Sequence, residues 1–417
     1  MAFQSETGAM KILICGGGIA GQAAAYWLAR AGHRVTVVER FPALRATGAQ
    51  VDLRGQGIEA VERMGLLDVV RSKLVDEAGV AFVNGQGKAR GTIMANTSGR
   101  GRQTLTSEYE IMRGDLVRIL HAATEDDVDY VFGVRVECFE QDGQRVVAHF
   151  SDGSSDEFDL LVGADGQGSR IRRAILPYGS ADPYRPVGIH MAYWFIPRIA
   201  ADGNIRDTYH APRGRMIMRR SHNPTETQVY FVLRETSAEA SAIHRAPVER
   251  QKQFWAERFR DAGWQTDRFL DGMAGTESFY SQEVLQVRTD TWSRGRVVLV
   301  GDAAHCASPY SGMGVSGALV GAYVLAGAIN RHVHDLPTAL ANYDATLRPF
   351  VDEIQSTVKP RLLRLGMPTH QLGIDAFHAL AAAVCFLRIP ELVARLSKED
   401  RGGGWSLPEY PELVGAA

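Results

Sequence analysis

The chain has 417 residues, a formal net charge of −2, and a composition that is 45% hydrophobic and 23% charged. This length exceeds what one hydrophobic core usually serves, so we expect two or more packed units in a soluble protein. The near-zero charge and the lack of a long basic block argue against a nucleic-acid partner.

Targeting signals are also missing from the sequence. Residues 1–9 have neither the basic nor the apolar region of a signal peptide, and no apolar run reaches the roughly 20 residues of a spanning helix. The longest such run, Ala379–Leu387, has the length of a buried helix. The cysteines are scattered without metal-ligand or disulfide spacing, which predicts a reducing, cytoplasmic location and no metal site. They are Cys15, Cys138, Cys306 and Cys385.

The first element in chain order is a βαβ unit. An apolar strand leads into Gly16-x-Gly18-x-x-Gly21, a helix over 22–30 follows, and a second strand over 35–38 ends at Glu39. In such a unit the three glycines allow the tight turn, the approach of a pyrophosphate, and close helix–strand packing, in that order. A carboxylate at the end of the second strand can accept hydrogen bonds from both ribose hydroxyls. The unit predicts a dinucleotide ligand and leaves open whether this is FAD or NAD(P).

Helix and strand signals then alternate. Helical spacing recurs over 58–67 and after Asp115, with a strand at 80–83 and an exposed loop at 96–102 between them. From Tyr130 the hydrophobic period becomes two, and Asp-Gly pairs predict a small antiparallel meander. An apolar strand after the meander delivers Asp165 into a glycine-rich turn.

The second half predicts the domain organisation. Long alternating strands and one helix rich in aromatic residues occupy 183–282, which we interpret as a sheet domain inserted into the nucleotide-binding domain, 10–182 and 283–335. The nucleotide-binding domain resumes with a strand that ends at Gly301-Asp302 and continues into a helix of small residues. A C-terminal helical segment, 336–417, ends in a loop-like tail over 401–417.

Three turns that join glycine to an acid now stand in order over about 300 residues. They are Gly16-x-Gly18-x-x-Gly21, Asp165-Gly166-x-x-Ser169-x-x-Arg172, and Gly301-Asp302 followed by Pro309-x-x-Gly312-x-Gly314. Together they resemble the single-component FAD-dependent aromatic hydroxylases of the para-hydroxybenzoate hydroxylase fold. The segment 48–53, with Arg45 ahead of it, is most similar to the branch of tetracycline-inactivating flavin monooxygenases. The resemblance runs from Met10 to about Ile329.

The resemblance implies a fold class and a set of cofactor contacts. The fold is α/β: a Rossmann-like FAD-binding domain with an inserted, mainly antiparallel substrate sheet and a C-terminal helical segment. The first glycine turn and Glu39 hold the ADP half of FAD, Asp302 meets the ribityl and pyrophosphate region, and Asp52 lies beside the isoalloxazine. Arg45 matches a position implicated in NADPH binding. The cofactor-binding residues that we predict are Gly16, Gly18, Ala20, Gly21, Glu39, Arg40, Arg45, Asp52, Arg113, Asp165, Asp302, Gly314 and Val315.

Without the resemblance, some of these residues have plainer readings. Arg113 and Arg45 would be interpreted as solvated charges, and His305 as a satisfied structural histidine. Asp302 differs, because an acid beside Gly301 at a strand end is costly to bury unless something pairs with it. The sequence departs from the family pattern at Met313, Ser316 and Gly321-Ala322, which lie at the expected pyrimidine end of the flavin.

The resemblance also implies an activity. The protein would be an NAD(P)H-dependent FAD monooxygenase of secondary metabolism, a monomer or homodimer, that hydroxylates a polycyclic aromatic, polyketide-like or alkaloid-like small molecule through a flavin C4a-hydroperoxide. Antibiotic inactivation is a subset of this hypothesis. Since the cofactor carries the chemistry, we predict no catalytic triad or dyad.

The substrate pocket should lie between the flavin and the inserted sheet. Met191, Tyr193, Met218 and Tyr310 are our lining residues, although core packing explains each of them equally well. Two other functions stay open. One is a flavin-dependent Baeyer–Villiger or oxidative cyclisation or rearrangement catalyst, and the other is a low-turnover protein that sequesters flavin or a ligand.

Overall fold

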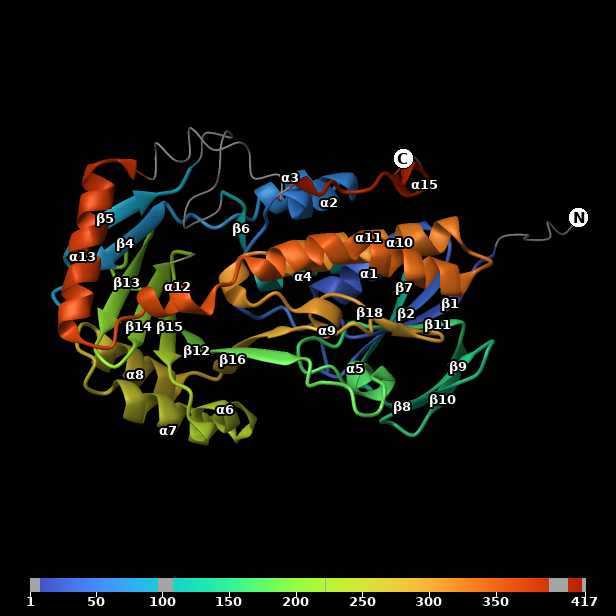
Figure 1. Ribbon diagram of the computed structural model, residues 1–417, viewed down its shortest axis with the longest axis horizontal. Coiled ribbons are helices and arrows are strands. Elements are labelled where there is room, and N and C mark those ends of the chain that lie inside the picture. Colours follow the sequence, from blue (N-terminus) through green and yellow to red (C-terminus); the bar gives the residue numbers. More distant parts are fainter. Residues whose placement is uncertain (1–7, 97–107, 222, 390–403, 415–417) are drawn as a thin grey trace, which may run out of the picture.

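The computed structural model describes residues 8–96, 108–221, 223–389 and 404–414 (Figure 1). Most of the loop expected at 96–102 and most of the N-terminal extension lie outside these residues. Within the described ranges the chain forms a mixed α/β structure with two large sheets, as the fold class predicted. No helix in these ranges is both long and apolar enough to cross a bilayer.

The nucleotide-binding part is built on a six-stranded sheet in the order β17-β18-β11-β1-β2-β7. β1 pairs in parallel with both β11 and β2, and β17 adds an antiparallel edge strand. Nearly every side chain of β1 and β11 is buried, because helices cover both faces of a parallel sheet. The strands are β1 Lys11–Cys15, β2 Arg34–Glu39, β7 Val128–Phe132, β11 Leu160–Gly163, β17 Ser293–Arg294 and β18 Val297–Leu299.

Helices from distant parts of the sequence pack over this sheet. α1 lies against α10, whose residues from Ser316 to Ile329 are all buried, and the small side chains of both helices allow the close approach (Figure 1). α10 in turn packs against α11 and α2. The helices of this part are α1 Ile19–Arg30, α2 Gln56–Arg63, α3 Leu67–Arg71, α4 Arg113–Ala122, α5 Arg170–Ile175, α9 Asp302–His305, α10 Gly314–Arg331 and α11 Leu336–Ser356.

Two small sheets complete this part. The predicted meander is present as β8 Val136–Gln141, β9 Val146–Phe150 and β10 Ser155–Phe158, all antiparallel. At its first turn, Asp142 Oδ1 accepts hydrogen bonds from the backbone amides of Gln144 and Arg145 at 2.6 and 2.8 Å. A separate ribbon pairs β3 Gln50–Asp52 with β6 Glu110–Met112 and sets Asp52 opposite Glu110.

The second large sheet has seven strands in the order β16-β12-β15-β14-β13-β4-β5. β4 and β5 come from the range expected to belong to the nucleotide-binding domain, and β4 pairs in parallel with β13. The sheet therefore extends beyond the predicted range 183–282, because alternation predicts a strand but not its partner. The strands are β4 Gly79–Val83, β5 Ala89–Met94, β12 Tyr184–Pro197, β13 Ile205–Ala211, β14 Arg215–Ser221, β15 Glu226–Arg234 and β16 Tyr280–Val287.

The two faces of this sheet differ. On one face Trp194, Ile217 and Phe231 are buried against α7 Val248–Phe259 and α8 Thr266–Gly275, beside the short α6 Ala238–Ala242 and η1 Ile243–Arg245. The opposite face combines buried side chains, such as Val232, with partly buried ones, such as Met191 and Met218. A sheet with one covered face and one face open to a neighbouring unit is a natural wall for a ligand site.

The C-terminal region corrects two expectations. All of the run Ala379–Leu387 except Leu387 lies in a helix, α13 Gln371–Phe386, but the helix is not buried. Leu380 is 64% exposed and Phe386 85% exposed, because α13 packs one side only against β5 and β13. The tail, expected to be loop-like, contains α15 Pro411–Val414 and anchors on the buried Tyr410. α12 Pro360–Leu365 and η2 Pro309–Ser311 complete the list of elements.

Candidate cofactor and substrate site

The first glycine turn has the geometry that its sequence predicted. Gly16 has φ = +113°, and a Cβ there would lie 2.6 Å from the carbonyl oxygen of Ala164. A Cβ at Gly21 would lie 1.9 Å from the carbonyl oxygen of Gly16. At Gly18 the nearest atom to a Cβ is the Nη2 of Arg113, at 3.5 Å. The turn is therefore sterically closed at two glycines and open at the one that a pyrophosphate would approach.

Glu39 is fixed at the end of β2 beside this turn. Its Oε2 accepts a hydrogen bond from the Gly17 amide at 2.8 Å, and its Oε1 accepts one from the Phe41 amide at 3.1 Å. Each carboxylate oxygen has lone pairs left for further donors. The geometry suits the predicted ribose contact. The neighbouring Arg40 is exposed, with its guanidinium 5.0 Å from the Phe41 ring.

Asp302 lies in an enclosed space that solvent still reaches. It directly follows Gly301, whose φ is +61° and where a Cβ would lie 2.6 Å from the Cβ of Ala20. The side chain is exposed, yet surrounding protein raises the pKa of its carboxyl, against the opposing effects of Cys306 and of Arg113. A carboxyl that is both solvent-accessible and desolvated marks the wall of an internal cleft.

Arg113 lies near Asp302, and Arg45 lies near Arg113. Arg113 Nη1 donates to the carbonyl oxygens of Arg45 and Thr47 at 3.1 and 2.9 Å, and burial followed by the nearby Arg45 charge lowers its pKa. The Arg45 guanidinium lies 4.7 Å from the ring of Phe41 and 5.9 Å from that of Tyr280. The structure thus brings Arg113, Arg45 and the glycine turn together, although they are distant in sequence.

In the second predicted turn, the two carboxylate oxygens of Asp165 differ in their hydrogen bonding. Asp165 Oδ2 accepts hydrogen bonds from the amides of Arg170 and Ile171, at the start of α5, at 2.7 and 3.3 Å. Its Oδ1 is buried and has no partner among the described residues. Arg172, in contrast, is fully buried and donates to the carbonyl oxygens of Ala303 and Gln167, so it ties this turn to α9.

Asp52 faces the third turn. It forms a salt bridge of 3.1 Å with Arg54, and its Oδ2 lies 3.5 Å from where a Cβ on Gly312 would be. Ser316, one of the departures from the family pattern, exchanges hydrogen bonds of 3.0 Å with the backbone amide and carbonyl of Arg54. A Cβ on Gly314 would meet nothing within 4 Å, so the first turn of α10, with Val315 partly buried behind it, borders open space.

The four predicted lining residues lie on one side of the seven-stranded sheet. Met191 and Tyr193 are half-buried on β12, while Ala192 between them and Trp194 after them belong to the helix-covered face. Met191, Met218 and Tyr310 belong to one cluster, in which the Tyr310 hydroxyl is 3.9 Å from the Met367 sulfur. Tyr193 lies 5.1 Å from Tyr280 and 5.5 Å from Tyr230, measured between ring centroids.

Sequence reasoning missed a buried polar network that lies beside these lining residues. Glu110 Oε2 accepts hydrogen bonds from Gln50 Nε2 at 2.6 Å and from Arg220 Nη2 at 2.8 Å, and Arg220 also pairs with Glu77. Burial raises the pKa of the Glu110 carboxyl, with Arg220 opposing the shift. Since its members come from four separate segments, no local sequence pattern announces the network.

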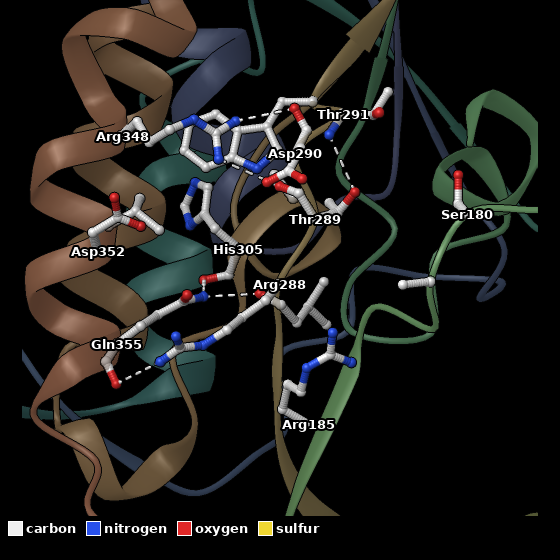
Figure 2. Close-up of a pocket in the computed structure, with 15 residues that line it drawn as sticks. Ser180, Arg185, Arg288, Thr289, Asp290, Thr291, His305, Arg348, Asp352 and Gln355 are labelled. Atoms are coloured by element: carbon white, nitrogen blue, oxygen red, sulfur yellow. Dashed lines mark hydrogen bonds between the residues drawn. The ribbon is translucent and has the colours of Figure 1, made fainter. Parts of the chain in front are cut away.

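His305 lies behind the cleft and not in it. A cavity of about 410 Å³ lies between α11, α9 and the segment 287–292. His305 and Gln355 belong to its wall (Figure 2). The histidine is 3% exposed, and burial lowers its pKa to about 4, so the ring is neutral. Its Nε2 has no partner among the described residues and lies 3.3 Å from where a Cβ on Gly321 would be.

Comparisons with known proteins agree with this geometry. The family described as FAD binding domain matches residues 9–357. The FAD-dependent monooxygenase asL4 of Sarocladium schorii is 38% identical, with 97% of this chain and 99% of the relative aligned. The flavin-dependent monooxygenase eupH of a Phoma species is 37% identical over 96% of this chain and 98% of its own. The solved structure of the tetracycline destructase Tet(51) has a TM-score of 0.78 at 30% identity, covering 96% of this chain and 99% of that chain.

Proposed function

This chain belongs to the FAD binding domain family and is an FAD-dependent monooxygenase, and from that premise we propose that it uses NAD(P)H and O₂ to hydroxylate a polycyclic, oxygenated small molecule. The observation that carries the proposal is a set of neighbouring groups around Arg113. Its Nη2 lies 3.5 Å from where a Cβ on Gly18 would be, and Asp302, Tyr193 and Tyr280 are close enough to influence its charge. The Arg45 guanidinium lies 5.9 Å from the Tyr280 ring.

The residues present fit an FAD bound beside these groups. The turn at Gly18 is open, Asp165 keeps an unpaired oxygen, and the first turn of α10 at Gly314 borders a void. We assign Glu39 to the ribose, Gly18 and Arg113 to the pyrophosphate, Asp302 to the ribityl region and Asp52 to the ring. When bound, the flavin supplies electron transfer from NAD(P)H and activation of O₂.

The protein's own contribution is to orient the substrate and exclude water. The Tyr193 ring is tilted by 40° to the Tyr230 ring and by 36° to the Tyr280 ring, and the three rings form an aromatic wall. Met191, Met216 and Met218 extend this wall with side chains that adapt to irregular shapes. Aromatic rings of a substrate pack against such a wall in offset or edge-to-face contacts. A polycyclic aromatic or polyketide substrate is the class that this surface supports best, and tetracycline is a suitable first probe because of the likeness to Tet(51).

Turnover tests this function directly. Purified protein loaded with FAD should oxidise NADPH slowly alone and at least about tenfold faster with a productive substrate, and the product should gain one oxygen atom. The assay follows NADPH absorbance and product mass over a panel of tetracyclines, anthraquinones and indole alkaloids. A colourless protein that FAD cannot reconstitute would contradict the proposal. A product whose ring is expanded or rearranged would favour the alternative chemistry on the same flavin.

Arg113→Ala and Asp302→Ala are expected to lower flavin occupancy. Each removes a group that borders the cleft beside Gly18, and a lost charge-assisted hydrogen bond costs about 1.5–3 kcal/mol, or roughly 10- to 150-fold in the dissociation constant of FAD. Titration of the apoprotein, followed by flavin fluorescence, measures this constant. Arg45→Ala is the control, since it should slow reduction by NADPH and spare occupancy. Equal FAD affinity in all four proteins would refute the assignment.

A further inference from the structure

Strand β13 turns three polar side chains toward the interior, and each has one polar atom without a partner. These atoms are Nε of Arg206, Oγ1 of Thr208 and Nδ1 of His210, and none finds a hydrogen-bond partner within the described ranges. Thr208 and His210 are 5% and 4% exposed. Buried polar atoms are nearly always paired in folded proteins, so three in succession on one strand indicate a surface that is completed by a ligand.

The three side chains share the wall that carries the predicted substrate residues. Thr208 is paired with Met218, and His210 with Met216. Both methionines pack with Tyr310, whereas the intervening residues of β13 point to the helix-covered face. Alternate residues of a strand are about 6.6 Å apart, so Arg206 and His210 are separated by about 13 Å along this wall.

Arg206 differs from its neighbour Arg220. Arg220 donates two hydrogen bonds to Glu77, at 2.7 and 2.9 Å, and one to Glu110, at 2.8 Å. Arg206 interacts with these two carboxylates through space only, and burial together with the Arg220 charge lowers its pKa. The Nε of Arg206 thus remains a buried donor without a partner among the described residues, and a charge-assisted hydrogen bond to an acidic oxygen of a ligand would satisfy it.

His210 is set up as a neutral acceptor. Its Nε2 lies 3.0 Å from the carbonyl oxygen of Gly366, which can only accept, so Nε2 carries the proton and Nδ1 a free lone pair. Burial lowers its pKa to about 4, and the ring therefore stays neutral at pH 7. His210 also lines a cavity of about 540 Å³ together with His378 and Asp375, so the row ends at open space.

We propose that β13 is the recognition strand for an elongated, oxygenated substrate that places an acidic oxygen, a carboxylate or an enolate, at Arg206 and a hydroxyl group at His210, with Thr208 bonding a polar group between them. This inference rests on the proposed function and specifies the substrate of that same site. The tyrosine wall binds the flat rings, and β13 selects molecules by charge at one end and by a hydroxyl at the other.

A binding experiment without turnover tests the charge selection. The probes are 1,8-dihydroxyanthraquinone-3-carboxylic acid and its methyl ester, and equilibrium dialysis against FAD-loaded protein without NADPH gives both dissociation constants. The wild-type protein should bind the acid at least about tenfold more tightly, equivalent to about 1.4 kcal/mol. Arg206→Met should reduce this ratio to below about twofold, and Arg206→Lys should restore part of it. Arg213→Met is the matched control, because Arg213 is exposed and pairs with Asp261.

The hydroxyl selection has its own variant. His210→Gln keeps a donor for Gly366 and removes the Nδ1 acceptor, so it should abolish the preference for the dihydroxy acid over anthraquinone-2-carboxylic acid. A wild-type protein without charge preference, or an Arg206→Met variant that keeps it, would overturn the proposal. Flavin content and NADPH oxidation are measured on the same preparations. If flavin content and NADPH oxidation are absent but the preference for the acid is intact, the proposed function is contradicted and the proposal for β13 still holds.

Discussion

Gly21→Ala is expected to abolish flavin retention, with at least about a hundredfold weaker FAD binding. The added Cβ would lie 1.9 Å from the carbonyl oxygen of Gly16, which is main chain and cannot rotate away as a side chain can. The turn and the start of α1 must therefore separate. Gly16 is itself held by its amide, which donates to the Val38 carbonyl at 2.8 Å, and by the carbonyl oxygen of Ala164 on its other side. The readout is the dissociation constant of FAD from apoprotein, with circular dichroism to verify the fold.

Gly17→Ala supplies the control in the same turn. A Cβ there would lie 3.4 Å from the Cβ of Glu39, which is an ordinary van der Waals contact, and the amide that Glu39 binds is retained. This variant should bind FAD within about threefold of the wild-type protein. If Gly21→Ala also retained FAD at that level, the close packing of turn and helix described above would be wrong.

As the pH is lowered, this protein should begin to unfold at a pH well above that at which its carboxylates take up protons. His33, His210 and His305 are 6%, 4% and 3% exposed, and burial lowers the pKa of each to about 4. A histidine whose pKa is lower in the folded state stabilises the fold above its unfolded pKa of about 6.5 and loses that contribution as the pH falls toward 4. At pH 5 each ring costs about 2 kcal/mol, roughly 6 kcal/mol together.

That loss is comparable to the whole stability of a typical protein, about 5–15 kcal/mol. The midpoint of urea denaturation should therefore fall steeply between pH 7 and pH 5. His33→Asn tests the cause, because an asparagine oxygen can replace the Nδ1 that accepts from the Met10 amide at 3.1 Å while removing the titration. It should remove about 2 kcal/mol of the loss of stability at pH 5. The exposed His334→Asn should leave the dependence unchanged, and a flat profile in the wild-type protein would contradict the account.

Much of the fold was predictable because its information is local. The βαβ unit at the start of the chain needs only contiguous residues: glycines that sterics require, an apolar strand on each side and an acid at the second strand's end. The meander was predictable for the same reason, since Asp142 bonds the backbone amides two and three residues further along. The family resemblance then connected three such turns, and the comparisons confirm the family and its cofactor.

The surroundings of the site were decided by contacts between distant segments. β4 reads as a strand in the sequence and β5 was not predicted, yet only the sheet shows that β4 pairs with β13, some 120 residues further on. The sequence predicted that the outer face of α13 is buried, because its side chains are hydrophobic. Hydrophobicity alone does not reveal whether another element packs against that face.

The sequence by itself therefore determined the glycine turn of the βαβ unit, and the tertiary structure decided which side chains meet on the seven-stranded sheet. Glycine sterics and strand periodicity act over a few residues, so they can be read along the chain. Arg220 pairs with Glu77 and Glu110, whereas Arg206 Nε finds no partner among the residues that the structure describes, and this difference depends on which strands meet. Charge and hydrogen bonding act through space, and for these arginines the neighbours in space come from elsewhere in the sequence.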